Sequence, residues 1–247
     1  MKSLISILGL FFKAFIKNDK RSRFKIAERI FNRIYPTYFI GEWGKICHDE
    51  NEFIYWFKKM EGKNPHSFER KYTLKELIKL TDEIKGDTVE LGVYYGASSY
   101  LIAQHGTRFN KSHHMLDSWE GLSKPSKEDG DYWSKNDLSS SLDHCKKNLL
   151  PIEKKFLVYY KGWIPMTLQK IPDNLFFSFI HFDLDLYEPT KHGLEFFYDR
   201  LNTGGMIVFD DYTFTTCPGV KLAVDEFFEN KKENVILLPY QAFVIKK

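Results

Sequence analysis

Short apolar runs alternate with stretches of helical periodicity from about residue 73 to the C-terminus. The runs have the length and the apolar character of buried strands. They lie at residues 88–93, 112–116, 156–160, 176–182, 206–209, 235–238 and 242–245. Strands that alternate with helices form right-handed βαβ units, which predict an α/β fold with a mainly parallel sheet. The last two runs leave no room for a crossover helix, so they are expected to pair antiparallel.

Helices are predicted between these strands and before them. Thr73, with Glu76 three residues later, has the pattern of a capping box, and its helix is expected to reach about Glu83. The other helices are expected at residues 23–34, 52–60, 97–104, 138–149, 165–170, 189–201 and 220–230. The change in texture divides the chain into a helical segment, residues 1–70, and an α/β domain, residues 71–247.

The charge of the chain is uneven. Its 247 residues carry a net +3, yet residues 1–33 contain nine lysines and arginines against two acidic residues, a net +7, so the rest carries −4. A nucleic-acid-binding protein usually has its basic face on the folded body, so this distribution argues against nucleic acid as a partner. Cys47, Cys145 and Cys217 show no metal-ligand spacing, which fits reduced thiols and a cytoplasmic location.

An apolar run, residues 4–16, lies within the basic segment. It is too short to span a membrane, and no small-residue cleavage site of a signal peptide follows it. An amphipathic helix is therefore predicted, which would dock on the body, on a partner subunit of a homo-oligomer or on a membrane surface. The last of these would put residues 1–33 in peripheral contact with a membrane.

The turn after the first strand has features of a nucleotide-type loop. Gly92 and Gly96 allow tight turning and close approach of a ligand to the backbone, and the next helix offers free N–H groups. The turn lacks the dinucleotide and phosphate-loop fingerprints, and Glu90 beside it suits a cationic ligand better than a pyrophosphate. An ordinary strand–turn–helix connection is the alternative. Asp117, after the second strand, could accept ribose hydroxyls or cap a helix.

Four aspartates follow two later strands: Asp183 and Asp185 after the fourth, Asp210 and Asp211 after the fifth. Ligands bind beyond the carboxyl ends of the strands in such sheets. Four carboxylates at neighbouring strand ends repel one another unless a cation lies between them. Oxygen ligands select hard ions such as Mg²⁺, Mn²⁺ or Ca²⁺. Capping of helices or turns would explain one or two of these acids, but not easily all four.

These motifs, taken in order, resemble the macrocin O-methyltransferase (TylF-type) family of sugar methyltransferases. Each similar stretch is unspecific alone, but the ordered set covers roughly residues 70–247. The stretches are residues 86–103, 117–122, 161–163, 181–190 and 201–228. The resemblance implies a Rossmann-like class I methyltransferase fold, with a seven-stranded sheet whose last strand is antiparallel. It also implies S-adenosylmethionine and Mg²⁺ (or Mn²⁺) as cofactors and a sugar hydroxyl as the acceptor.

The resemblance also assigns roles to single residues. Asp185 would be the catalytic general base, and Asp183, Asp210 and Asp211 would be the metal ligands. The cofactor would be bound by Glu90, Gly92, Tyr94, Gly96, Ser98, Asp117, Gly162 and Trp163. The basic N-terminal segment is the main departure from the family, where this region helps to cover the site, so the identity of the acceptor stays open.

Other functions are compatible with the same residues. Asp183-Leu184-Asp185 is a D-x-D string of the kind that holds a metal and a nucleotide sugar, so a metal-dependent glycosyltransferase is the enzyme alternative. A non-catalytic membrane-surface binding protein is the other. The acceptor could be a small molecule or a glycan, and Tyr132 and Trp133 in the polar loop 120–136 are expected to contribute to its site. The lone histidines, including His181, are expected to be satisfied core or edge residues.

Overall fold

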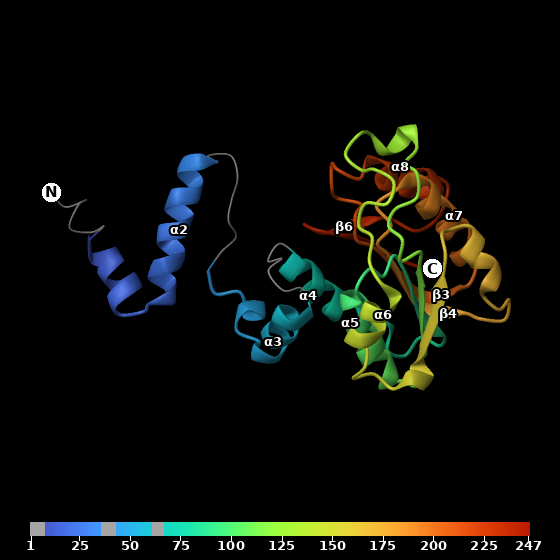
Figure 1. Cartoon of the computed structure of the whole chain (residues 1–247), viewed down its shortest axis with the longest axis horizontal. Helices are drawn as coiled ribbons and strands as arrows, with labels where there is room; N and C mark the ends of the chain where they lie inside the picture. Colours follow the sequence, from blue (N-terminus) through green and yellow to red (C-terminus); the bar gives the residue numbers. More distant parts are fainter. Residues whose placement is uncertain (1–7, 36–42, 61–66) are drawn as a thin grey trace. The chain divides into compact units, whose positions relative to one another are not determined.

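The computed structural model of the chain describes residues 8–35, 43–60 and 67–247 (Figure 1). The chain divides into two compact units, and the boundary between them in the sequence lies between Tyr55 and Trp56. The predicted boundary after residue 70 lies 15 residues beyond this division. It falls inside helix α4 (Phe68–Leu77), which belongs to the second unit because its Leu74 is fully buried in a core cluster with Phe179 of the sheet.

The first unit is helical, as predicted. Of the expected helix at residues 4–16, residues 4–7 lie outside the described residues, and residues 8–16 are helical, with Phe12–Ile16 (η1) wound as a π-helix. Helix α2 (Lys20–Ile34) begins three residues earlier than predicted, because the carboxylate of Asp19 accepts a hydrogen bond from the Ser22 amide (2.8 Å). A short turn, η2 (Ile46–His48), precedes α3 (Asn51–Met60), which crosses into the second unit.

The second unit is built on a seven-stranded sheet, which confirms the predicted α/β fold. The strand order is β3-β2-β1-β4-β5-β7-β6. Strands β1 to β5 pair parallel, and β7 pairs antiparallel with both β5 and β6, as expected for the last two runs. The strands are β1 (Asp87–Leu91), β2 (His113–Asp117), β3 (Leu157–Lys161), β4 (Phe177–Phe182), β5 (Leu201–Phe209), β6 (Ile236–Leu237) and β7 (Ala242–Ile245).

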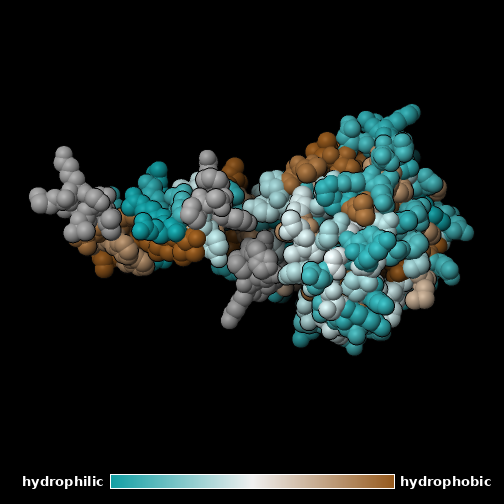
Figure 2. Space-filling view, turned by 90° about the horizontal axis from the view of Figure 1, so that it is seen from above, coloured by the Kyte–Doolittle hydropathy of each residue, from teal (hydrophilic) through white to brown (hydrophobic). Residues whose placement is uncertain are grey.

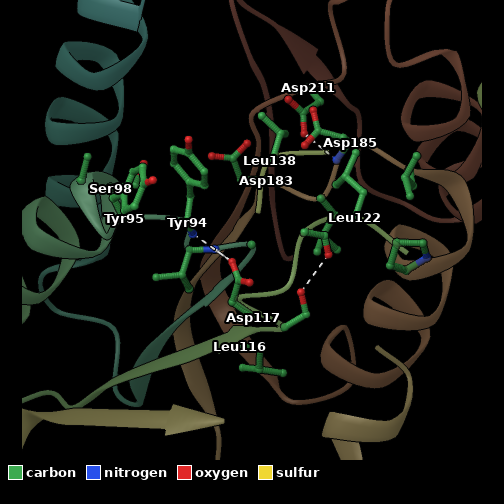
Figure 3. A pocket seen from close by; sticks show the side chains of 18 of the residues that line it. Tyr94, Tyr95, Ser98, Leu116, Asp117, Leu122, Leu138, Asp183, Asp185 and Asp211 are labelled. Carbon is green, nitrogen blue, oxygen red and sulfur yellow. Dashed lines mark hydrogen bonds between the residues drawn. The ribbon is translucent and has the colours of Figure 1, made fainter. Parts of the chain in front are cut away.

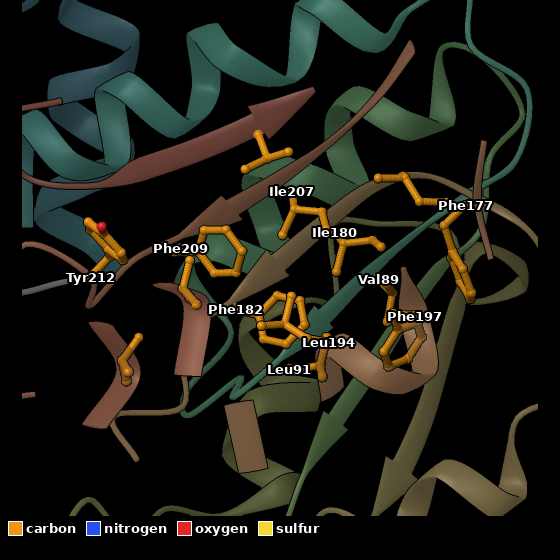
Figure 4. Packing of buried hydrophobic residues seen from close by; sticks show 14 of the residues in the cluster. Val89, Leu91, Phe177, Ile180, Phe182, Leu194, Phe197, Ile207, Phe209 and Tyr212 are labelled. Atoms are coloured by element: carbon orange, nitrogen blue, oxygen red, sulfur yellow. The ribbon is translucent and has the colours of Figure 1, made fainter. Parts of the chain in front are cut away.

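Helices cover both faces of this sheet because the buried strands are apolar on both sides. On one face, Ile180 and Phe182 of β4 pack with Leu194 of α7 (Figure 4). Val224 of α8 belongs to the same buried cluster. On the other face, Phe179 packs with side chains of α4 and α5. The helical elements of this unit, besides α4, are η4 (Ile78–Thr81), α5 (Ala97–Thr107), η5 (Lys127–Asp129), α6 (Leu142–Asn148), η6 (Lys154–Phe156), η7 (Met166–Lys170), α7 (Tyr187–Phe197) and α8 (Pro218–Phe228).

Two predicted helix starts are wrong. Thr73 does not cap a helix, since α4 begins at Phe68 and Thr73 lies in its interior. Burial of Lys71 and Leu74 in the second unit extends this helix beyond the local capping signal. The helix expected from residue 138 begins only at Leu142, because Leu138 has a left-handed backbone (φ +56°) and Ser141 caps the helix instead.

Candidate active site

A cavity of about 850 Å³ lies at the carboxyl ends of the central strands (Figure 3). Its walls come from the loops after β1, β2, β3, β4 and β5, as the rule for ligand sites in parallel sheets predicts. Most of the residues singled out in the sequence contribute to it, whereas Glu90, Gly96 and Asp210 are not among its lining residues. Those that line it are Gly92, Tyr94, Ser98, Asp117, Gly162, Trp163, Asp183, Asp185 and Asp211.

The loop between β1 and α5 is shaped by glycine. Gly92 has φ +84°, and a Cβ atom there would lie 1.7 Å from the carbonyl oxygen of Asp183. The amide of Asp183 donates to the carbonyl of Leu91 (2.8 Å), so the ends of β1 and β4 are held side by side at this point. Gly96 (φ +85°) precedes the first residue of α5. Only glycine allows the backbone of β4 to approach the loop so closely.

Asp117 fastens this loop to the end of β2. Its Oδ2 accepts hydrogen bonds from the amides of Val93 (2.7 Å) and Tyr94 (2.8 Å), and its Oδ1 accepts one from the amide of Trp119 (2.5 Å). Burial raises the pKa of Asp117, although these hydrogen bonds oppose the shift. No α-helix starts at Asp117, so the capping alternative is wrong, and the side chain instead shapes the cavity wall that it lines.

Glu90 is not at the cavity, contrary to the role expected of it in cofactor binding. It is fully buried within the sheet, where it accepts hydrogen bonds from Ser99 Oγ and His181 Nδ1 (2.9 Å). Burial alone would raise the pKa of Glu90, but the hydrogen bonds of His113 and His181 lower it to about 2. The partners of Glu90 lie on helix α5 (Ser99) and on the neighbouring strands β4 (His181) and β2 (His113), so its carboxylate is enclosed by protein groups and helps to orient His181.

The four aspartates divide into two groups. Among the described residues, His181, Asp183 and Asp210 form one potential metal-binding group, and Asp185, Asp211 and Cys217 form another. The predicted ligand set Asp183, Asp210 and Asp211 is therefore shared between two groups. Within each group, the candidate ligand atoms lie within 4.8 Å of one another.

Asp210 lies behind the cavity rather than in it. It is fully buried, with its Oδ1 3.4 Å from His181 Nε2 and hydrogen-bonded to Gln241 Nε2. Burial alone would lower the pKa of His181, but the hydrogen bonds to Asp210 and Glu90 raise it to about 9. His181 is thus a satisfied core residue, as expected, and it links the acid behind the cavity to the strand of Glu90.

Asp183, Asp185 and Asp211 face the cavity together (Figure 3). The backbone of Asp185 is left-handed (φ +60°), and its amide donates to Asp211 Oδ2 (3.0 Å). Burial, and after it the repulsion of neighbouring carboxylates that include Asp210, raise the pKa of Asp183 to about 6 and that of Asp185 to about 7. The same causes raise the pKa of Asp211. Three oxygen donors with incompletely neutralised charge fit a hard divalent cation.

Two basic residues of α4, which no sequence pattern indicated, lie close to the acids. Arg70 Nη1 lies 3.0 Å from Asp210 Oδ2 and 3.9 Å from Asp211 Oδ1. Lys71 Nζ lies 3.9 Å from Asp183 Oδ2 and is hydrogen-bonded to Ser98 Oγ. These two side chains therefore supply part of the positive charge that offsets the repulsion among the four carboxylates. The sequence had suggested a metal ion alone for this role. Basic residues are common on helices, so the sequence contains no signal that selects these two.

The loop between β2 and α6 forms another part of the cavity wall, and it contacts the glycine loop where Trp119 Nε1 donates to the carbonyl of Tyr94 (3.1 Å). Trp163 Nε1 donates to the carbonyl of Gly121 (3.0 Å), and Trp133 Nε1 donates to Cys217 Sγ (3.4 Å). Asp129 Oδ1 accepts a hydrogen bond from the backbone amide of Tyr187 (2.6 Å), and this bond anchors the loop to α7. Tyr132 and Trp133 both line the cavity, as expected for residues that contribute to an acceptor site.

Comparisons with known sequences give relatives of one kind. Residues 68–239 match the macrocin-O-methyltransferase (TylF) family. A relative from Streptomyces olivaceus, 8-demethyl-8-(2,3-dimethoxy-alpha-L-rhamnosyl)-tetracenomycin-C 4'-O-methyltransferase, is 30% identical over 154 residues, 56% of this chain and 57% of the relative. Demethyldecarbamoylnovobiocin O-methyltransferase from Streptomyces niveus is 30% identical over 163 residues, 59% of each chain. The chain thus spans less than two thirds of the length of either relative.

Solved methyltransferase structures share the fold. The O-methyltransferase NovP has a TM-score of 0.62 at 21% identity, covering 73% of this chain and 80% of NovP. The calicheamicin methyltransferase CalS11 has a TM-score of 0.64 at 18% identity, covering 84% of this chain and 99% of CalS11. SAH-bound PaMTH1 of Podospora anserina has a TM-score of 0.54 at 14% identity, covering 82% of this chain and 92% of PaMTH1. These similarities confirm the predicted class I methyltransferase fold.

Proposed function

Because the chain belongs to the macrocin O-methyltransferase (TylF) family, we propose that it moves a methyl group from S-adenosylmethionine to a hydroxyl of a sugar or sugar-containing acceptor, with the help of a divalent metal ion. One observation carries the proposal. The carboxylates of Asp183, Asp185 and Asp211 share one cavity with the glycine loop after β1. A site for the methyl donor and a site for an activated hydroxyl therefore adjoin each other.

The glycine-loop side of the cavity would hold the methyl donor. S-adenosylmethionine, when bound, supplies an electrophilic methyl group on a sulfonium centre. Gly92, Tyr94 and Ser98 would border its methionine part, and Asp117 the ribose. Asp117 Oδ1 accepts a hydrogen bond from the amide of Trp119 and could accept another from a ribose hydroxyl. Gly162 and Trp163, after β3, would border the adenine. Methyl transfer is an in-line displacement, so the fixed position of this loop contributes to rate through orientation.

The acidic side of the cavity would hold the metal and the acceptor. Asp183 and Asp211 would bind a Mg²⁺ or Mn²⁺ ion, which, when bound, lowers the cost of forming an alkoxide from an alcohol. Asp185 would accept the proton of the acceptor hydroxyl. Asp210 would not bind the metal directly, since it does not line the cavity and is already paired with Arg70. Tyr132 and Trp133 offer aromatic faces on which a sugar ring could pack.

Glycosyl transfer is less well supported. The D-x-D string lies inside the region that matches the methyltransferase family, and the glycine loop precedes it in the same cavity. Calorimetry separates the two activities. Micromolar binding of S-adenosylmethionine or of its demethylated product supports methyl transfer. Binding of a nucleotide sugar without either of these would overturn the proposal.

Removal of divalent metal is expected to lower methyl transfer to a sugar acceptor by at least about tenfold, because the alkoxide would lose its stabilisation. The measurement is transfer of a labelled methyl group in EDTA, followed by addition of Mg²⁺ or Mn²⁺. Asp211→Asn should raise the Mg²⁺ concentration that gives half-maximal activity. Activity that is equal with and without EDTA, and unaffected by Asp211→Asn, would exclude the metal from the mechanism.

Replacing Lys71 by Met is expected to weaken S-adenosylmethionine binding by about 10- to 100-fold, the effect of losing a charge-assisted hydrogen bond. Lys71 is buried beside Ser98, where it would place a cation near the carboxylate of the methionine part. Calorimetry gives the dissociation constant directly. Lys79→Met, which removes an exposed ion pair with Glu76, is the matched control and should leave binding unchanged. If both variants bound S-adenosylmethionine equally tightly, Lys71 would have no role in binding the methyl donor.

A further inference from the structure

The first unit exposes large apolar side chains on both of its main helical segments. Phe12, Phe15 and Ile16 of η1 are 52%, 59% and 71% exposed, and Ile30 and Ile34 of α2 are 56% and 63% exposed. In Figure 2, hydrophobic and hydrophilic side chains of this part of the chain gather on different sides. Apolar side chains that cluster in this way at a surface commonly mark a contact with another molecule or a membrane.

The contacts between these segments explain why the large side chains stay outside. Arg23 Nε donates to the carbonyl of Ala14 (2.9 Å), and Asp19 caps α2 at Ser22. Ala14 and Ser22, both small, are the buried residues of η1 and α2. Small and polar groups therefore hold the two segments together, and the guanidinium of Arg23 also lies over the ring of Phe15, 6.0 Å from its centroid. The large side chains named above nevertheless keep more than half of their surface exposed.

Positive charge accompanies this apolar surface. Residues 8–35 contain eight lysines and arginines against two acids, Asp19 and Glu28. On α2, a helical periodicity of 100° per residue puts Lys25, Arg29 and Arg33 on the side away from Phe24 and Phe31. A helix with an apolar face and a Lys/Arg-rich polar face is suited to lie in the interface of a membrane whose headgroups are anionic.

We propose that residues 8–35 bind the surface of an anionic phospholipid membrane, with the Phe and Ile side chains inserted among the acyl chains and the basic side chains at the headgroups. The segment would lie on the membrane, because no described helix of the chain is long and apolar enough to cross one. A second copy of the chain is a weaker candidate for this surface. A symmetric contact would bring two strongly basic patches together, and like charges repel.

Vesicle flotation of the full chain tests this proposal. Binding is expected to vesicles of phosphatidylcholine with phosphatidylglycerol, to be weaker on phosphatidylcholine alone, and to fall as salt is added. The variant Lys25→Gln/Arg29→Gln/Arg33→Gln should lower affinity for the anionic vesicles on the order of 100-fold. Its matched control neutralises three exposed lysines of the second unit, Lys147, Lys154 and Lys232, and should bind like the unmodified chain.

The apolar contribution has its own variants. Ile16→Gln/Ile34→Gln should lower binding to both kinds of vesicle by about tenfold or more, whereas Ile16→Leu/Ile34→Leu should retain it. The control Leu150→Gln/Met166→Gln changes two equally exposed apolar residues of the second unit and should have no effect. Absence of binding to anionic vesicles would overturn the proposal. So would an oligomer, seen by sedimentation, that dissociates in the Gln variants while vesicle binding persists.

Discussion

Asp185→Asn is expected to lower kcat of methyl transfer by about 10²- to 10⁴-fold, the usual contribution of a general base. The amide cannot take the proton of the acceptor hydroxyl, although it has nearly the same shape as the carboxylate. The dissociation constant of S-adenosylmethionine should stay within a few-fold of its original value, because the glycine loop is untouched. Stopped assays with saturating acceptor give kcat, and calorimetry gives the dissociation constant.

The backbone conformation at residue 185 should tolerate this substitution without a structural change. Asp185 is in the left-handed region, which Asn adopts more readily than most residues, and its amide can still donate to Asp211. The fold and the position of Asp211 should therefore be preserved. Asp173→Asn, at a fully exposed carboxylate on the surface, is the matched control and should leave kcat unchanged. A kcat near the original value in Asp185→Asn, with the metal requirement intact, would take the role of base away from Asp185.

Much of the fold could be predicted because the pattern is local. Buried parallel strands are apolar along their length, and the turns between elements contain glycine or polar residues, so the strands and their order in the chain are readable. The antiparallel pairing of β6 and β7 followed from the short connection between them. The resemblance to the TylF family, read from the same motifs, is confirmed by the match over residues 68–239. Helix starts were less predictable, since burial of Leu74 overrode a capping pattern.

The sequence pattern indicated the strand ends where the acids lie, but not which of their side chains face the cavity. Asp183 and Asp185 are two residues apart and both line the cavity. Asp210 and Asp211 are adjacent, and successive side chains at a strand end point to opposite sides, so only Asp211 reaches the cavity. Arg70 could not have been found in this way, because its partner Asp210 lies 140 residues further along the chain.

Arg70→Met is expected to lower the free energy of unfolding by about 3–5 kcal/mol, the cost of leaving a buried charge without its partner. Asp210 is fully buried, and its Oδ2 accepts no hydrogen bond from the described residues, so the guanidinium 3.0 Å away is the main compensation for that oxygen. Burial alone would raise the pKa of Asp210, but Arg70, with Lys71 and His181, holds it well below its usual range. Urea unfolding at neutral pH measures the loss.

The pH dependence follows from the sign of that shift. A carboxylate whose pKa is depressed by folding stabilises the protein above its unfolded pKa, about 3.9, and loses this contribution as the pH falls toward the folded value. Without Arg70 the pKa of Asp210 rises, so the difference in stability between the two proteins should be largest near neutral pH and should shrink at acid pH. A difference that is the same at every pH would mean that the lost packing, not the ion pair, is responsible.

A matched substitution at Arg200 isolates the effect of the buried partner carboxylate. The Arg200 side chain is as exposed as that of Arg70, 21% against 20%, but its partner Asp173 is fully exposed to solvent. Arg200→Met should therefore destabilise the protein clearly less, because it leaves no buried charge behind. The double variant Arg70→Met/Asp210→Asn should recover part of the lost stability, since the unpaired carboxylate is gone. If the double variant were no more stable than Arg70→Met alone, the charge of Asp210 would not be what Arg70 neutralises.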